Sequence, residues 1–142
     1  MTIHLIKLSV GPESLQDLID WQQQRLRDQR RKKQPELMHI TRHMPKRADE
    51  VLDGGSIYWV IKGWLCARQK LVELRPLKIE GVSHCGLIYD PEMIRVRPRQ
   101  QRPFQGWRYF DPKSAPADLK RGAKDPDMSD ELWRELNALG LV

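Results

Sequence analysis

The strongest constraint on the fold is a pair of apolar runs separated by a single glycine. Residues 56–62 read Ser-Ile-Tyr-Trp-Val-Ile-Lys, and residues 64–74 follow after Gly63 with a second run of largely apolar character. β-Branched and aromatic residues favour strands, and two such runs joined by a short glycine-containing turn are typical of a hairpin. The middle of the chain is therefore predicted to form an antiparallel hairpin in the core of a sheet.

Other segments extend this pattern to both ends of the chain. The run at 2–9 predicts a first strand, and Ser14 is a good N-cap for a helix from about 14 to about 30. Pro45 is suited to the first turn of a short helix at 45–52, and a last helix is expected from Ser129. Further strands are predicted at 37–41, 77–79, 82–89, 93–96 and 106–110, with Pro76 as an interruption and an irregular stretch from Arg97 to Phe104.

These elements predict one α+β domain over residues 1–142, a length typical of a single domain. The strand-rich core spans about 56–110, and a loop and helix occupy 111–142. The sheet is expected to be mixed or antiparallel with helices near both termini, and a partly closed β-barrel is an alternative arrangement of the same strands.

The apolar runs, the first residues and the cysteines together indicate in which cellular compartment the protein is expected. No run of 18 apolar residues is present, so we expect no membrane span, and the first residues lack the basic and apolar regions of a signal peptide. A cytoplasmic, reducing location is therefore expected. In that compartment Cys66 and Cys85 are predicted to be buried thiols rather than a disulfide.

Positive charge is concentrated in the body of the chain. The formal net charge is +6, and residues 111–142 hold five basic and seven acidic groups, so residues 1–110 carry 20 basic against 12 acidic groups, a net of +8. An anionic partner is one explanation, and solubility alone is the other.

Signals for metal or nucleophilic chemistry are weak. His39 and His43 are four residues apart, but their segment reads as extended and no glutamate completes a zinc motif. No Gly-x-Ser-x-Gly sequence is present, and neighbouring His84 and Cys85 would point to opposite faces of a strand. We predict no metal and no cofactor, and whether the protein is an enzyme is left open, with the balance against it.

The first basic cluster comprises Arg42, Lys46 and Arg47, around Pro45. If a helix begins at Pro45, the two cations of its first turn oppose the helix dipole. A helix N-terminus binds phosphate well, so an anion is predicted at this position, with solvated surface charge as the alternative.

The second basic cluster contains five arginines and no acid between residues 95 and 108. Arginine binds phosphate in a bidentate manner and stacks on bases, and aromatic residues between arginines are typical of single-strand binding. The alternative is that the arginines form the polar face of an edge strand and that Trp107 belongs to the core. The candidate binding residues of this cluster are Arg95, Arg97, Arg99, Arg102, Phe104, Trp107 and Arg108.

Several strings resemble an uncharacterised bacterial family, domain of unknown function 1489. They are Thr41-Arg42, Pro45-Lys46-Arg47, the string from Leu52 to Gly63, Arg68-Gln69 and the string from Arg102 to Tyr109. The resemblance covers nearly the whole chain but implies no activity. A looser likeness, to small β-barrels of the PUA, ASCH and EVE type, implies binding of RNA or modified bases by fold analogy alone.

Three functions are therefore considered. The first is binding of RNA or single-stranded DNA through the two basic clusters, with Tyr58 as a further stacking surface beside Phe104 and Trp107. The second is an enzyme or binding protein for a small anionic ligand such as a nucleotide, with His43 or His84 as the acid–base group. The third is a protein-interaction adaptor that uses the acidic C-terminal helix.

Overall fold

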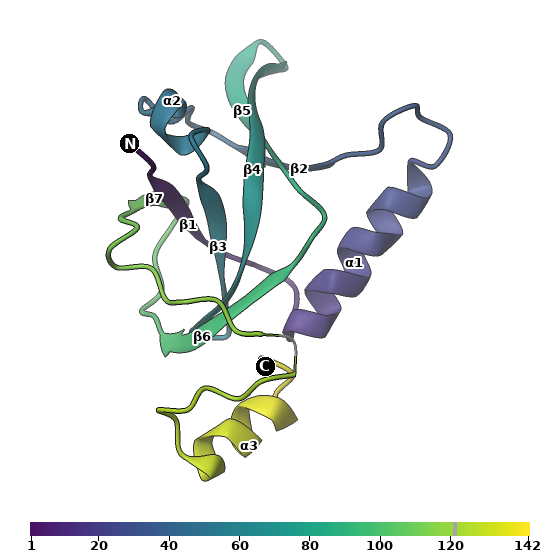
Figure 1. The fold of residues 1–142 in the computed structure, drawn as a ribbon. Helices are drawn as coiled ribbons and strands as arrows, with labels where there is room; N and C mark the ends of the chain where they lie inside the picture. Colours follow the sequence, from purple (N-terminus) through teal and green to yellow (C-terminus); the bar gives the residue numbers. More distant parts are fainter. Residues whose placement is uncertain (121) are drawn as a thin grey trace.

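A computed structural model describes residues 1–120 and 122–142 (Figure 1). The helices are α1 (Leu15–Asp28), α2 (Ala48–Val51) and α3 (Asp130–Ala138). The strands are β1 (His4–Leu8), β2 (Leu37–Thr41), β3 (Ser56–Ile61), β4 (Trp64–Ile79), β5 (Val82–Tyr89), β6 (Ile94–Gln100) and β7 (Trp107–Phe110).

The strands form one mixed sheet, which confirms the predicted α+β class. Their order is β2-β5-β4-β3-β1-β7, and β6 pairs with β4 outside this path. β1 and β3 are parallel, and the other pairs are antiparallel. In the described part of the chain β2 and β7 do not pair with each other, so the sheet is not closed into a barrel.

β4 is the longest strand and is shared between two parts of the sheet. Its first half lies between β3 and β6, and its second half pairs with β5 alone in the described chain. The prediction that Pro76 interrupts the strand is wrong, since Pro76 pairs with Cys85 within β4. A proline lacks an N–H, but at a free strand edge no neighbour needs that donor.

Two tight turns fix the hairpins of the sheet. Lys62-Gly63 joins β3 to β4, and Glu80-Gly81 joins β4 to β5, with φ between 51° and 81° at all four residues. Two successive positive φ angles are typical of the type I′ turn, whose twist matches that of paired strands. The turn at Gly63 therefore forms the predicted hairpin, and the turn at Gly81 forms a second one.

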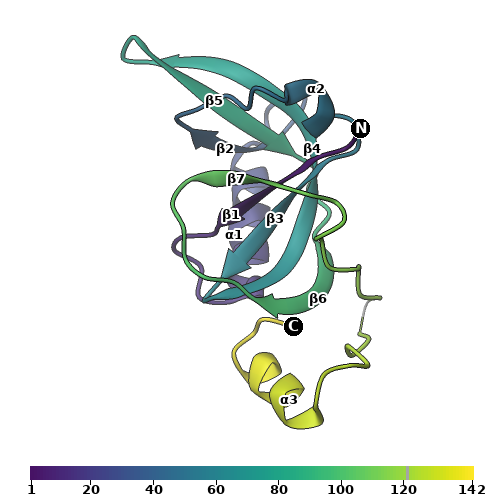
Figure 2. The same cartoon turned by 90° about the vertical axis from the view of Figure 1, so that its left-hand side faces the viewer.

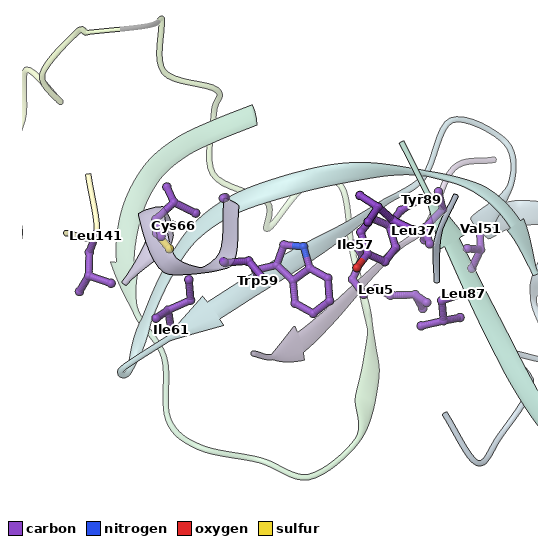
Figure 3. Packing of buried hydrophobic residues seen from close by; sticks show 14 of the residues in the cluster. Leu5, Leu37, Val51, Ile57, Trp59, Ile61, Cys66, Leu87, Tyr89 and Leu141 are labelled. Carbon is purple, nitrogen blue, oxygen red and sulfur yellow. The ribbon is translucent and has the colours of Figure 1, made fainter. Parts of the chain in front are cut away.

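Both faces of the sheet are covered, and β3 shows this directly because all six of its residues are buried. Ile57, Trp59 and Ile61 face the main core beneath α1, and Trp59 lies in the middle of that cluster (Figure 3). The alternate residues Tyr58 and Val60 face a second, smaller core. That core also contains Ile6, Leu65, Val96, Phe104 and Phe110.

A buried polar network fastens α1 to the sheet. Gln22 of α1 and Gln69 of β4 form two reciprocal amide hydrogen bonds of 2.9 and 2.7 Å. The indole N–H of Trp59 donates to the Gln69 side-chain oxygen at 2.8 Å, and the Gln69 amide donates to the Asp90 carbonyl at 3.1 Å. Every hydrogen-bonding site of the Gln69 side chain is therefore used.

Gly55 occupies a position with no room for a side chain. A Cβ there would lie 2.2 Å from the carbonyl oxygen of Val51 and 2.4 Å from that of Ile3. The backbone of the loop before β3 therefore passes directly against two other backbone segments, which only glycine permits.

The C-terminal segment is tied to the sheet by arginine–carboxylate pairs. Arg68 of β4 makes a bidentate pair with Asp118, at 2.8 and 2.7 Å, and Arg97 of β6 contacts both Asp125 and Asp127. α3 follows beside β6 (Figures 1 and 2). Among the described residues, no helix is long and apolar enough to cross a membrane.

Candidate nucleic-acid interface

β7 is the last strand of the sheet and presents different side chains on its two faces. It pairs with β1 so that Lys7 lies opposite Trp107 and Ile6 lies opposite Arg108. Trp107 and Tyr109 share one face and contact each other edge to face, with ring centroids 5.0 Å apart. Arg108 and Phe110 lie on the other face, because side chains alternate along a strand.

The first basic cluster packs against the Trp107 and Tyr109 face of β7. The indole N–H of Trp107 donates to the carbonyl of His43 at 3.1 Å, and the backbone N–H of Arg47 donates to the Tyr109 hydroxyl at 3.0 Å. The Arg47 guanidinium also lies 5.4 Å from the centroid of the Tyr109 ring. Two segments more than 60 residues apart in the chain are thus joined at one strand.

The local structure of this first cluster differs from the prediction. α2 begins at Ala48 rather than at Pro45 and has four residues, and Arg47 precedes it. Arg47 forms a bidentate pair with Glu50, at 2.5 and 2.9 Å, and this pair lowers the pKa of the Glu50 carboxyl. The helix start at Pro45, on which the predicted anion site depended, is therefore wrong, and the cation nearest to the helix is already paired with Glu50.

Two other members of the cluster remain at the surface. Arg42 donates to the backbone carbonyl of Ser83 at 2.5 Å and stays exposed. Lys46 is exposed and has no side-chain partner among the described residues.

Part of the second basic cluster gathers over an aromatic pair on the opposite face of β7. The Arg99 guanidinium lies 5.5 Å from the Phe110 ring centroid, and that of Arg108 lies 4.8 Å from the Phe104 centroid. Arg102 is exposed two residues before Phe104. Arg99 additionally donates to the Ser114 carbonyl at 2.7 Å. In the described chain, none of these three arginines has a carboxylate partner.

The remaining predicted residues lie elsewhere or are covered. Arg97 is neutralised by Asp125 and Asp127, and its hydrogen bond lowers the pKa of Asp125. Arg95 lines a cavity beside α3 instead of the β7 surface. Tyr58 is 4% exposed and contacts other rings edge to face, so it offers no free face for a base.

Phe104 is also largely buried, at 8% exposure, which corrects its expected role as a stacking platform. Its ring supports Arg108 instead. The exposed aromatic side chain of this region is Tyr109, at 36%, with Trp107 partly exposed beside it. The alternation of residues along 107–110 could have identified Tyr109, since Phe110 and Tyr109 must face opposite sides.

Lys7 adds a cation to the Trp107 face, since it lies opposite Trp107 in the sheet. It is half-buried, and burial lowers the pKa of its amine. The sequence around Lys7 did not predict that it lies next to Trp107, because this contact depends on the pairing of β1 with β7.

We use the name β7 surface for Lys46, Arg99, Arg102, Arg108, Trp107 and Tyr109. It combines four cations free of carboxylate partners in the described chain with two adjacent rings. His43 and His84, the acid–base candidates, do not line the cavity beside α3. Within residues 1–120 and 122–142, no group of three His, Cys, Asp or Glu side chains could hold a metal ion.

Comparisons with known proteins place the chain in a family. No curated protein and no solved structure matches it, so the likeness to PUA-type barrels stays a prediction. A family model described as "Protein of unknown function (DUF1489)" matches residues 5–142. This match includes β1 through α3, and with it the β7 surface and the cavity beside α3. The chain belongs to the DUF1489 family.

Proposed function

We propose that the protein binds single-stranded nucleic acid, RNA or DNA, across the β7 surface. The observation that carries this proposal is the meeting of the two basic clusters at one strand. Trp107 and Tyr109 hold the 43–47 segment on one face of β7, and Arg99 and Arg108 lie on the other. Cations on both sides of an open strand edge suit a flexible backbone that passes around that edge.

The chemistry of these side chains fits phosphate and base together. Arginine held over an aromatic ring is fixed in position, so its remaining N–H groups can bind phosphate with little loss of conformational freedom. The exposed ring of Tyr109, next to Trp107, offers a surface on which a base can stack. Aromatic stacking tolerates any base, so we expect weak sequence preference.

A single strand fits better than a duplex. Reading of the major groove usually needs a helix or a two-stranded ribbon that projects from the protein. β7 has four residues and lies flat against β1, and α2 beside it has only four. A single strand can instead expose its bases to Tyr109.

The adaptor hypothesis has less support from the surface near α3. Leu139 is the one large hydrophobic residue exposed at the end of that helix in the described chain, at 58%. The exposed Trp21 on α1 is covered on one face by the guanidinium of Arg25, 4.0 Å from the ring centroid. A single leucine is an ordinary surface feature.

The test compares two double variants, each of which removes two positive charges. Binding of labelled single-stranded RNA and DNA is measured by fluorescence anisotropy at low salt. Arg102→Ala/Arg108→Ala removes two cations from the β7 surface. Arg30→Ala/Arg31→Ala removes two exposed cations beyond the end of α1, on the opposite side of the molecule (Figure 1).

We expect the β7 double variant to weaken binding by about tenfold or more and the control by less than about twofold. Equal losses in both variants would mean that binding follows net charge alone, which contradicts a site at β7.

A further inference from the structure

A cavity of about 410 Å³ lies between the sheet and the C-terminal segment. β4 contributes Cys66, β6 contributes Arg95 and Val96, and α3 contributes Trp133 and Asn137. The volume falls in the range of small-ligand sites, and the mixture of apolar walls with a few polar groups is typical of them. None of the residues of the β7 surface lines it.

Arg95, which lines this cavity, has one guanidinium nitrogen without a hydrogen-bond partner. Its Nη1 atom is the one buried side-chain nitrogen or oxygen without a hydrogen-bond partner in residues 1–120 and 122–142. A buried polar group without a partner is costly, and a charged one more so. Such a group in the described chain calls for an explanation, and a bound anion or an ordered water beside Arg95 would supply one.

Two arginines near Arg95 in the sheet each have a carboxylate partner. Arg68 binds Asp118 and Arg97 binds Asp125, so the segment that crosses the sheet here supplies a carboxylate to each. The same segment meets Arg95 through its backbone, where the N–H of Leu119 donates to the Arg95 carbonyl at 2.8 Å. Arg68 and Arg97 thus each have a carboxylate partner, whereas Arg95 has none in the described chain.

Among the described lining residues, Arg95 carries the one charged side chain. Burial raises the pKa of the Cys66 thiol to about 12, so Cys66 stays neutral. A neutral thiol of this kind is not a nucleophile, which argues for binding rather than covalent chemistry. Trp133 and Asn137 also line the cavity, so the indole and the amide can contact a ligand there.

We propose that this cavity binds a small organic anion, whose carboxylate or phosphate pairs with Arg95 and whose apolar or aromatic body lies against Trp133. An anion in the cavity would neutralise the charge of Arg95, which lines the cavity and has no carboxylate partner in the described chain. Arginine pairs with both kinds of anion in a bidentate manner. The apolar walls, formed by Val96, Leu119 and Leu141 among others, suit a ligand that carries a ring or short hydrocarbon body.

The test titrates the protein with benzoate, phenyl phosphate and AMP, with benzamide as the uncharged counterpart of benzoate. Binding is followed by isothermal calorimetry and by the shift of the Trp133 indole N–H signal in ¹H–¹⁵N NMR spectra. We expect saturable binding of at least one anion and none of benzamide. Benzoate alone would assign the site to carboxylates, and phenyl phosphate or AMP alone would assign it to phosphate esters.

Arg95→Met keeps the length and apolar stem of the side chain and removes its charge. We expect it to weaken binding of the anion by about tenfold or more while the thermal midpoint of the free protein stays the same or rises, because an unpaired buried charge is removed. The matched control is Arg31→Met, at an exposed position beyond the end of α1, and it should leave anion binding unchanged. Absence of saturable binding by all three anions at 10 mM, roughly the weak end of ligand affinities, would overturn the proposal. So would binding that Arg95→Met does not alter.

The same variant separates this inference from the proposed function. Arg95 does not belong to the β7 surface, so Arg95→Met should change oligonucleotide affinity by less than about twofold. A failure of nucleic-acid binding would leave the anion site untouched, and the reverse also holds.

Discussion

Replacement of Gln69 by leucine should be among the most destabilising conservative changes in this protein. Leucine is similar in size, so the loss of hydrogen bonds dominates. The indole N–H of Trp59, the amide of Gln22 and the carbonyl of Asp90 would each lose a partner. Each buried unsatisfied group costs about 1–3 kcal/mol, and allowing for partial access of water we expect a loss of about 3–5 kcal/mol in the free energy of unfolding.

A double-variant cycle tests the reasoning behind that figure. Gln22→Leu together with Gln69→Leu removes both amides, so fewer groups are left without partners. The double variant should therefore lose less than the sum of the two single variants, by about 2 kcal/mol. Urea unfolding followed by far-UV circular dichroism measures all three. A loss under about 1 kcal/mol for Gln69→Leu, or strict additivity, would refute the account of the network.

Three further predictions concern the backbone, the histidines and the thiols. Gly55→Ala should destabilise the protein by several times more than Gly81→Ala, which strains φ (about 1–2 kcal/mol) but meets no atom within 4 Å; urea midpoints compare them. Burial lowers the pKa of His39 to about 4, below its unfolded value of 6.5, so the unfolded state binds more protons between these values and stability should fall as pH drops from 6.5 to 4. His39→Gln should flatten that decline in unfolding free energy, and an unchanged slope would contradict the assignment. Cys66 and Cys85 are both buried with raised thiol pKa, so a thiol reagent such as DTNB should label neither in the native protein and both in guanidinium chloride.

Local signals in the sequence predicted most of the elements. Ser14 caps α1 as expected, and its side-chain oxygen accepts the backbone N–H of Asp17 at 3.1 Å. Ser129 does the same for Leu132 at the start of α3. A cap, a hairpin glycine and an apolar alternation each act within a few residues, so the sequence alone reveals them.

The errors arose where distant residues decide the outcome. Pro76 is tolerated in β4 because β3 has already ended, which depends on the register of another strand. α2 starts late because Pro45 is buried and the backbone N–H of Arg47 is bound to Tyr109. Neither contact can be inferred from the residues next to these positions.

The sequence identified the two basic clusters but not which of their arginines are paired with carboxylates in the fold. Charge alone identified both basic clusters, yet Arg47 and Arg97 proved to be neutralised by Glu50 and by the aspartates of the C-terminal segment. Whether an arginine is free depends on which carboxylate the fold brings to it. Arg95 and Arg97 lie two residues apart in β6, yet only Arg97 is paired with carboxylates in the described chain.

The measurement that tests the central proposal most directly is the salt dependence of single-strand binding. A labelled RNA of about 12 nucleotides, within the range of known single-strand site sizes, is titrated with the protein at a series of salt concentrations. Four cations at the β7 surface predict that log affinity falls with log salt with a slope of about −2 to −3, and that Arg102→Ala/Arg108→Ala reduces the slope by about 1.4. No binding at low salt, or a slope unchanged by the double variant, would contradict the account.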